Sequence, residues 1–300
     1  MNRRKFLQNI TLGSGAVLLS FNGFGQLISK KKTTKLTILH TNDTHSNIDP
    51  FPINHAKFPG MGGVSRRHAL IQKIRQNEEH VLLLDSGDIF QGTPYFNMFN
   101  GELEMKLMSE LGYDAATMGN HDFDIGLDGF KKAKRHAKFP FLCANYDFSE
   151  TILNGETNRY EIFQKGNLKI GVFGIGIELN GLVTEKNYEN TKYLDPISIA
   201  NSVAKELKQK GCDLVICLSH LGYDYPDSTK ISDRKLAQQS THIDIILGGH
   251  THTFLEKPTI EKNKKGKNVL INQVGYAGLY LGRIDIDVEK GVISKNLEIK

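Results

Sequence analysis

Short apolar runs alternate with amphipathic stretches along most of this 300-residue chain. Four of the runs consist almost entirely of Leu, Ile and Val, which is typical of strands buried on both faces. These runs occupy residues 36–39, 81–84, 214–218 and 244–247. Between them, the pattern predicts helices over residues 64–78, 102–111, 127–138 and 197–210. This alternation predicts a layered α/β domain.

Further strands extend the same pattern. Residues 160–164 and 168–175 predict two strands joined by a tight turn at 165–167, and residues 141–145 predict a short strand. Segments 269–274 and 279–288 are expected to complete the second sheet. Gly112 follows the helix at 102–111 and predicts its end, because Gly readily adopts the left-handed conformation after a helix.

Polar clusters follow the buried runs at the points where the predicted strands end. The five clusters are Asp43-Thr44-His45, Gly87-Asp88, Gly119-Asn120-His121-Asp122, Ser219-His220 and Gly249-His250-Thr251-His252. In open sheets ligands bind outside the carboxyl ends of the strands, so these side chains are expected to meet in one crevice. Carboxylate and imidazole together suit Mn, Zn, Fe, Co or Ni, whereas Mg and Ca sites are nearly all oxygen. The clusters therefore predict a mixed nitrogen and oxygen site for transition metals.

The order D-x-H, G-D, G-N-H-D, H and G-H-x-H resembles the calcineurin-like metallophosphoesterase superfamily. Within it, Asn120-His121-Asp122-Phe123-Asp124 is similar to the N-H-[DE]-F-D motif of the 5'-nucleotidase family, and Thr41-Asn42-Asp43-Thr44-His45 to its T-N-D-x-H motif. The resemblance extends from residue 36 to the end of the chain. It implies one four-layer α/β/β/α sandwich of the metallophosphoesterase type. It also implies a metal-dependent hydrolase of phosphoric esters that resembles a 5'-nucleotidase.

Carried over residue by residue, the resemblance implies a centre of two divalent metal ions, with Mn, Zn, Fe or Co as candidates. One ion would be held by Asp43, His45, Asp88 and His252, and the other by Asp88, Asn120, His220 and His250. Asp88 would bridge the ions, and a hydroxide held between two such ions can attack phosphorus in line with the leaving oxygen. The family uses the His at position 121 to stabilise the transferring phosphoryl group or to protonate the leaving alkoxide. Asp124 would orient His121.

Other interpretations of the same residues stay open. Isolated histidines are more often hydrogen-bonded structural residues than ligands, and six without a motif partner are interpreted in this way: His40, His55, His68, His80, His136 and His242. The alternatives to a nucleotide substrate are a broad-specificity phosphomonoesterase, a nucleotide-sugar or cyclic-nucleotide hydrolase, and a sulfur-ester hydrolase on the same fold. A metal- or partner-binding module is the non-enzymatic alternative. His121 and Asp124 argue against it, because a binding module needs no general acid.

The N-terminus predicts export. Residues 2–8 resemble the twin-arginine export motif, with Arg3 and Arg4 ahead of a mildly apolar run over 10–24. We therefore expect a signal peptide at 1–25, a basic linker at 26–35, and the metallophosphoesterase catalytic domain at 36–300. The apolar run is shorter than the roughly 20 residues needed to span a bilayer, so no stable membrane anchor is expected after cleavage. The expected location is the periplasm.

Composition agrees with an exported enzyme, and the resemblance implies a phosphorylated small molecule, such as a nucleotide, as its partner. Arg3, Arg4 and Lys5 supply three of the five net positive charges, so the rest of the chain carries about +2, too little to indicate a nucleic-acid polymer as partner. Three cysteines in or beside apolar runs predict buried thiols: Cys143, Cys212 and Cys217. Full-length 5'-nucleotidases carry a C-terminal domain whose aromatic residues stack on the base, and this chain is expected to lack it. Specificity is then either broad or supplied by a separate chain carrying that domain.

Overall fold

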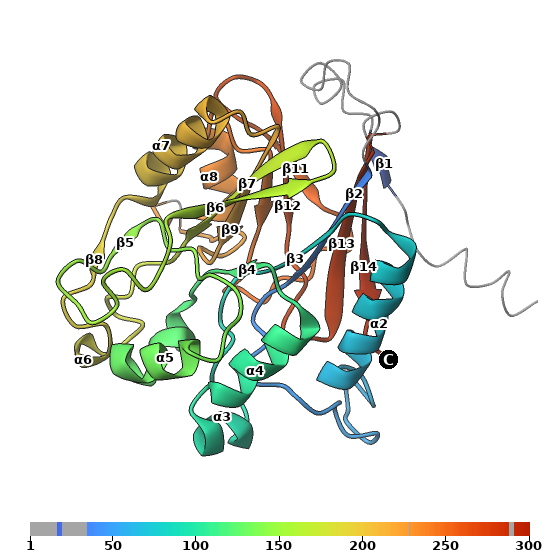
Figure 1. Ribbon diagram of the computed structural model, residues 1–300, viewed down its shortest axis with the longest axis vertical. Helices are drawn as coiled ribbons and strands as arrows, with labels where there is room; N and C mark the ends of the chain where they lie inside the picture. Colours follow the sequence, from blue (N-terminus) through green and yellow to red (C-terminus); the bar gives the residue numbers. More distant parts are fainter. Residues whose placement is uncertain (1–16, 20–34, 228, 288–290) are drawn as a thin grey trace, which may run out of the picture.

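The computed structural model describes residues 17–19, 35–227, 229–287 and 291–300. Two six-stranded sheets pack face to face, and helices cover their outer surfaces (Figure 1). In Figure 1, α7 and α8 lie beside one sheet, while α2 lies beside the other. The predicted four-layer α/β/β/α sandwich is confirmed by this arrangement.

The first sheet has the strand order β1-β14-β13-β2-β3-β4. Its strands are β1 (Val17–Leu19), β2 (Lys35–Thr41), β3 (Val81–Asp85), β4 (Ala115–Ala116), β13 (Tyr280–Asp287) and β14 (Gly291–Glu298). The three strands β2, β3 and β4 run parallel, whereas β13 is antiparallel to both of its neighbours. The carboxyl ends of β2, β3 and β4 therefore meet at one edge.

The second sheet has the order β11-β12-β10-β9-β7-β6. Its strands are β6 (Tyr160–Lys165), β7 (Leu168–Ile175), β9 (Leu214–Ser219), β10 (Ile245–Leu247), β11 (Thr259–Lys262) and β12 (Asn268–Asn272). The central strands β7, β9, β10 and β12 are parallel, and the two edge strands are antiparallel. A separate pair is formed by β5 (Tyr146–Asp147) and β8 (Lys192–Tyr193).

The helices follow the predicted alternation. They are α2 (Val64–Asn77), α3 (Pro94–Phe99), α4 (Glu102–Leu111), the 3₁₀ helix η1 (Asn120–Phe123), α5 (Gly126–Lys134), α6 (Glu185–Tyr188), α7 (Pro196–Gln209) and α8 (Asp233–Gln239). Helices α2, α4 and α5 pack on the first sheet, and α7 and α8 pack on the second. Gly112 ends α4 with φ 75°, as the sequence predicts.

Three apolar layers hold the sandwich together, and the two-residue period of the strands divides side chains between them. In β9, Leu214, Ile216 and Leu218 face the layer between the sheets. Val215 and Cys217 face the opposite way, towards α7 and α8. A strand buried on both faces has few polar positions, so most of its polar residues follow where it ends.

Two sequence-based predictions of strands were wrong. Segment 279–288 contains β13, which lies in the first sheet, where Ile284 is opposite Ile38 of β2. An apolar strand pattern shows that a strand is buried but not which neighbour it pairs with, and both sheets bury similar residues. Segment 141–145 forms only isolated bridges at Phe141 and Leu142, and the neighbouring strand begins at Tyr146.

The predicted twin-arginine motif lies outside the described residues, as do most of the predicted signal peptide and linker. Three residues of that segment, Val17–Leu19, form β1 and pair with β14. Among the helices of the described part of the chain, none has both the length and the apolar character needed to cross a membrane.

Candidate metal centre

All five polar clusters lie at one edge of the sandwich. They follow β2, β3, β4, β9 and β10, whose parallel carboxyl ends point to the same side within each sheet. Ser86 joins the two sheets there, because its hydroxyl after β3 donates to the carbonyl of Leu247 at the end of β10 (2.8 Å). Asp43 and His250, separated by 207 residues in the sequence, thus come together.

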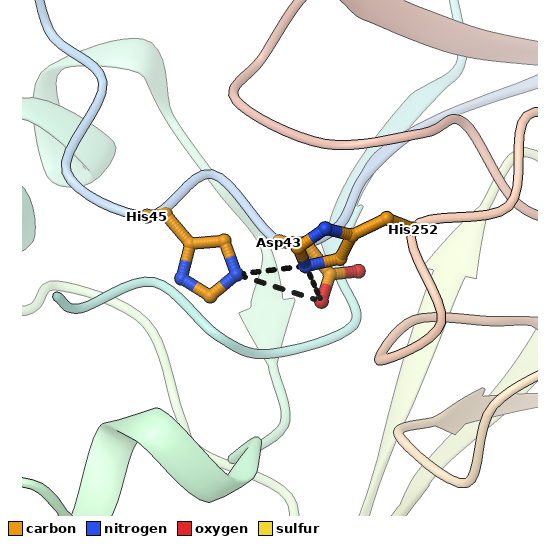
Figure 2. Close-up of side chains that lie close together, drawn as sticks. All are labelled: Asp43, His45 and His252. Atoms are coloured by element: carbon orange, nitrogen blue, oxygen red, sulfur yellow. Dashed lines mark hydrogen bonds and ion pairs between the residues drawn. The ribbon is translucent and has the colours of Figure 1, made fainter. Parts of the chain in front are cut away.

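Asp43, His45 and His252 form the first group of candidate ligands. Figure 2 shows both imidazole rings converging on the Asp43 carboxylate from different loops. Asp43 Oδ1 lies 3.4 Å from His252 Nε2 and 3.9 Å from His45 Nε2, and the two Nε2 atoms are 3.0 Å apart. His45 Nδ1 lies 3.1 Å from the carbonyl oxygen of Phe90, which fixes the ring and leaves Nε2 facing the group.

Asp88, His220 and His250 form the second group. His220 donates from Nδ1 to the carbonyl of Ser86 (2.7 Å), which turns Nε2 towards Asp88 Oδ2 at 3.1 Å. His220 Nε2 is buried, yet it lacks a hydrogen-bond partner of acceptable geometry within the described structure. A buried ring nitrogen of this kind is suited to a metal ion, because imidazole binds metals through the nitrogen that its other hydrogen bond leaves free.

Asp88 connects the two groups, and Asn120 joins the second. Asp88 Oδ2 is 3.8 Å from His45 Nε2, and His220 Nε2 is 3.9 Å from Asp43 Oδ1. Asn120 Oδ1 lies 2.8 Å from His250 Nδ1. The seven residues predicted as metal ligands therefore form one continuous set, with Asp88 between its two halves.

Backbone strain is concentrated at this centre. Asp43, His45, Asp88, His250 and His252 all have positive φ, between 46° and 72°. Non-glycine residues in this region cost about 1–3 kcal/mol each and persist where the surroundings determine them. Contacts such as the two hydrogen bonds from His250 N to the Asp43 carboxylate (3.0 Å each) hold these conformations. With these conformations, alternate side chains of one loop, such as Asp43 and His45, face the same point.

Electrostatics also favours cations at the centre. Burial alone would raise the pKa of Asp88, but the imidazoles of His220, His45 and His121 hold it well below its ordinary value. Burial alone would lower the pKa of His220, but the Asp88 and Asp43 carboxylates raise it to about 10. Burial lowers the pKa of His250 to about 4, so its ring stays neutral and keeps a lone pair. Carboxylates, neutral imidazole and the Asn120 carbonyl together fit two borderline divalent ions of the Mn, Fe, Co or Zn type.

His121 and Asp124 lie at the rim of the centre. His121 Nδ1 is 2.8 Å from Asp124 Oδ2, and the hydrogen bond from this carboxylate raises the pKa of His121 above its ordinary value. The His121 ring lies 5.3 Å, centroid to centroid, from the ring of His45. About a third of the His121 side chain is exposed, so it can reach a molecule bound at the centre.

Sequence reasoning missed the role of Asp122. Its buried carboxylate accepts hydrogen bonds from four backbone N–H groups: Asp88 (3.0 Å), Ile89 (3.0 Å), Phe90 (3.2 Å) and Gly119 (2.8 Å). One side chain thereby fixes the loop that carries Asp88 to the loop that carries Asn120. Asn42 has a similar role, since it donates to Asp43 Oδ2 (2.5 Å) and accepts from Val274 N (3.0 Å). Both residues belong to the motifs quoted above, and this was the signal that could have revealed their roles.

Gly119 is needed where the loops approach most closely. A Cβ atom at this position would lie 2.2 Å from Asp88 Oδ1 and 2.6 Å from His220 Cε1. No side chain fits between these two candidate ligands.

The remaining histidines and cysteines lie apart from the two groups of candidate ligands. His40 is fully buried, its Nε2 is 2.9 Å from Asn272 Nδ2, and burial lowers its pKa to about 3. His55, His68, His80, His136 and His242 likewise belong to neither group. The three cysteines are buried free thiols, as the sequence predicts.

Comparisons with known proteins agree with this geometry. Residues 36–254 match the family model of calcineurin-like phosphoesterases. The chain is 33% identical over 283 residues to the snake venom 5'-nucleotidase of Gloydius brevicauda, a match that covers 87% of this chain and 47% of the relative. The chain thus spans about half the length of the curated relatives it matches.

Solved structures show the same likeness. The 5'-nucleotidase precursor of Thermus thermophilus superimposes with a TM-score of 0.80 at 31% identity, over 88% of this chain and 54% of that protein. The sulfate thiohydrolase SoxB, from the same organism, superimposes with a TM-score of 0.72 at 19% identity, over 91% of this chain and 58% of that protein. The second likeness shows a shared fold and leaves the substrate undecided.

Proposed function

Because this chain belongs to the calcineurin-like phosphoesterase family, we propose that it is a two-metal hydrolase that releases phosphate from 5'-nucleotides. The observation that carries the proposal is the pair of adjoining ligand groups connected at Asp88, with the His121–Asp124 pair at their rim. Binding modules have no use for such a pair outside the ligand set, whereas hydrolases need a proton donor there.

The residues that would hold the metals divide into the same two groups that the distances define. Asp43, His45 and His252 would bind one ion, Asn120, His220 and His250 the other, and Asp88 would contact both. When bound, the ions would supply Lewis-acid activation of water and of the phosphoryl oxygens. His45 and His220 are already oriented for this by the carbonyls of Phe90 and Ser86.

His121 would donate a proton to the leaving group. Its Nδ1 bond to Asp124 leaves Nε2–H free to donate, and the raised pKa of His121 extends the protonated form to higher pH. As water attacks phosphorus and the P–O ester bond breaks, the departing alkoxide takes the proton from Nε2 and leaves as an alcohol.

The test compares His121→Ala with His136→Ala, because both imidazoles have 37% of their side chain exposed and only His121 lies at the centre. With Mn²⁺ added, we expect 5'-AMP to be hydrolysed, with kcat reduced about 10²- to 10⁴-fold in His121→Ala at unchanged metal content. His136→Ala should match the wild type. Equal activity in the two variants would refute the proposed role of His121. Turnover of sulfur-linked conjugates but of no phosphate ester would favour the sulfur-ester hypothesis instead.

We also propose that the chain is exported by the twin-arginine route. The support is the motif at residues 2–8, followed by a short apolar run. A reporter fused to residues 1–35 should reach the periplasm, and changing Arg3 and Arg4 to Lys should retain it in the cytoplasm. Export that does not depend on the two arginines would contradict this proposal.

A further inference from the structure

A cavity of about 600 Å³ adjoins the candidate metal centre at His250. Its walls come from the segment after β7, from β8, from the start of α7 and from the segment after β9. We call it the leaving-group pocket and define it by His250, Leu182, Tyr193, Tyr225, Glu178 and Asp195. Its size is within the usual 300–1,000 Å³ of small-molecule sites.

We propose that the leaving-group pocket receives the uncharged nucleoside end of a 5'-nucleotide while the phosphate lies at the metal centre. The inference rests on the proposed phosphoesterase function and adds a substrate subsite to it. Base recognition would then belong to this domain itself, and not only to residues of another domain or chain.

The position of the pocket suits a leaving group. His250 belongs to the second ligand group and also forms part of the pocket wall. The segment between β7 and β8 lies beside both the pocket and the rim residue Asp124, because it contains Leu182 and Asn187, and Asn187 Nδ2 donates to the backbone carbonyl of Asp124 (2.9 Å). Two other cavities, of about 650 and 420 Å³, border none of the nine predicted site residues.

The lining suits a planar ring system. Tyr193 and Tyr225 offer aromatic surface, and Leu182 and Leu221 add aliphatic surface. Burial, together with the Glu178 and Asp195 carboxylates, raises the pKa of Tyr193, so its hydroxyl stays neutral. Aromatic rings with a few polar groups are the usual lining of sites that bind heterocycles.

The charges in the pocket favour a neutral end with hydrogen-bond donors. Glu178 and Asp195 contribute two carboxylates. The positively charged ammonium of Lys230 lies over the Tyr225 ring, 5.4 Å from its centroid. Two carboxylates repel a second phosphate but accept hydrogen bonds from ribose hydroxyls and from an exocyclic amine. Adenosine has donors of both kinds.

The experiment fills the pocket from its rim and compares two matched variants. Leu182→Trp places a large ring where a half-exposed leucine lines the pocket, whereas Ile152→Trp makes a similar change at a similarly exposed position that borders none of the three cavities. Two quantities are measured for wild type and both variants. One is the ratio of kcat/KM for 5'-AMP to that for glycerol 2-phosphate with Mn²⁺. The other is the affinity of the metal-free protein for adenosine, measured by calorimetry.

We expect Leu182→Trp to lower the AMP preference about tenfold, mainly through KM, and to weaken adenosine binding by a similar factor. Ile152→Trp should change neither quantity. The pocket proposal is overturned if Leu182→Trp and wild type have the same AMP preference and the same affinity for adenosine. It is also overturned if the wild type neither prefers AMP nor binds adenosine. In that last case, turnover of both esters would leave the proposed function intact and place base recognition outside this domain. If no phosphate ester is hydrolysed, the proposed function fails, and adenosine binding still decides whether the pocket takes a nucleoside.

Discussion

The proposed proton donor depends on one hydrogen bond, between His121 Nδ1 and Asp124 Oδ2. This bond raises the pKa of His121, so the protonated form that can donate to a leaving group extends to higher pH. In the proposed mechanism, Asp124 therefore acts on the reaction through His121. Its removal should alter the pH profile as well as the rate.

We predict that Asp124→Asn moves the alkaline limb of the kcat profile to lower pH. The sign follows because activity that needs protonated His121 is lost as pH rises through its pKa, and the neutral amide no longer raises that pKa. At neutral pH kcat should fall by about 10- to 100-fold, the usual effect of losing a supporting hydrogen-bond partner. The measurement is kcat against pH from 5 to 10. An alkaline limb that stays where the wild type has it would show that Asp124 does not set the protonation of His121.

Asp122 is fully buried, yet its replacement is expected to affect the centre strongly. Its carboxylate accepts hydrogen bonds from four backbone N–H groups in the loops that carry Asp88 and Asn120. An amide in its place keeps one acceptor oxygen and turns an NH₂ group towards other N–H donors.

Asp122→Asn should therefore weaken metal binding by about 10- to 100-fold. Affinity for Mn²⁺ can be measured by competition with a chromophoric chelator, and part of the lost activity should return at saturating metal. Asp128→Asn is the matched control, because Asp128 lies exposed on α5 in an ion pair with Lys132. Equal metal affinity in both variants would mean that Asp122 does not position the ligands.

At the scale of elements, the end of α4 shows how a helix is held to its neighbour. Gly112 has φ 75°, and the Arg75 guanidinium donates to the carbonyls of Leu111 and Gly112, both at 2.6 Å. A Cβ atom on Gly112 would lie 2.8 Å from Arg75 Nη1, whereas one on Gly155, at φ 76°, would meet nothing within 4 Å.

Comparing these two glycines separates the cost of backbone strain from the cost of a steric contact. Gly155→Ala should cost about 1–2 kcal/mol, the price of the left-handed conformation alone. Gly112→Ala should cost a further 1–3 kcal/mol or so, because it also displaces the guanidinium from the helix end. Free energies of unfolding from urea titrations measure both, and kcat/KM of the folded protein should not change. Equal destabilisation would show that the Arg75 contact contributes little.

The elements also show how far sequence reasoning reaches. The buried strands and the polar clusters that end them could be predicted, because a strand covered on both faces is mostly apolar until it ends. The sheet to which β13 belongs could not, since Ile284 and Ile286 look the same in either sheet and only the pairing with β2 distinguishes them. The role of Asp122 was hidden for a related reason. Three of its four backbone partners lie more than thirty residues away in the chain, and a motif does not name them.

On the scale of the whole molecule, the centre connects both sheets, so metal binding should report on global stability. Its candidate ligands follow strands of each sheet, and Ser86 donates a hydrogen bond across to Leu247 beside them. An ion that binds only the folded protein stabilises it by about 2.7 kcal/mol at a hundredfold excess over its dissociation constant. Removing metal with a chelator should therefore lower Tm, and re-adding Mn²⁺ should restore it.

The gain in Tm on adding Mn²⁺ should be larger at pH 8 than at pH 6. In the metal-free protein the Asp88 and Asp43 carboxylates raise the pKa of His220 to about 10. A raised folded-state pKa contributes stability that is complete below the ordinary pKa near 6.5 and declines as pH rises towards 10, so the metal-free protein loses stability over this window. The ion must displace that proton from His220, and its affinity rises with pH for the same reason. Both effects increase the difference between metal-bound and metal-free protein at higher pH. Thermal unfolding of wild type and Asp43→Asn, each with chelator or Mn²⁺ at the two pH values, tests this directly. A gain that is the same at pH 6 and 8, or that Asp43→Asn retains in full, would mean that the stabilising ion binds elsewhere.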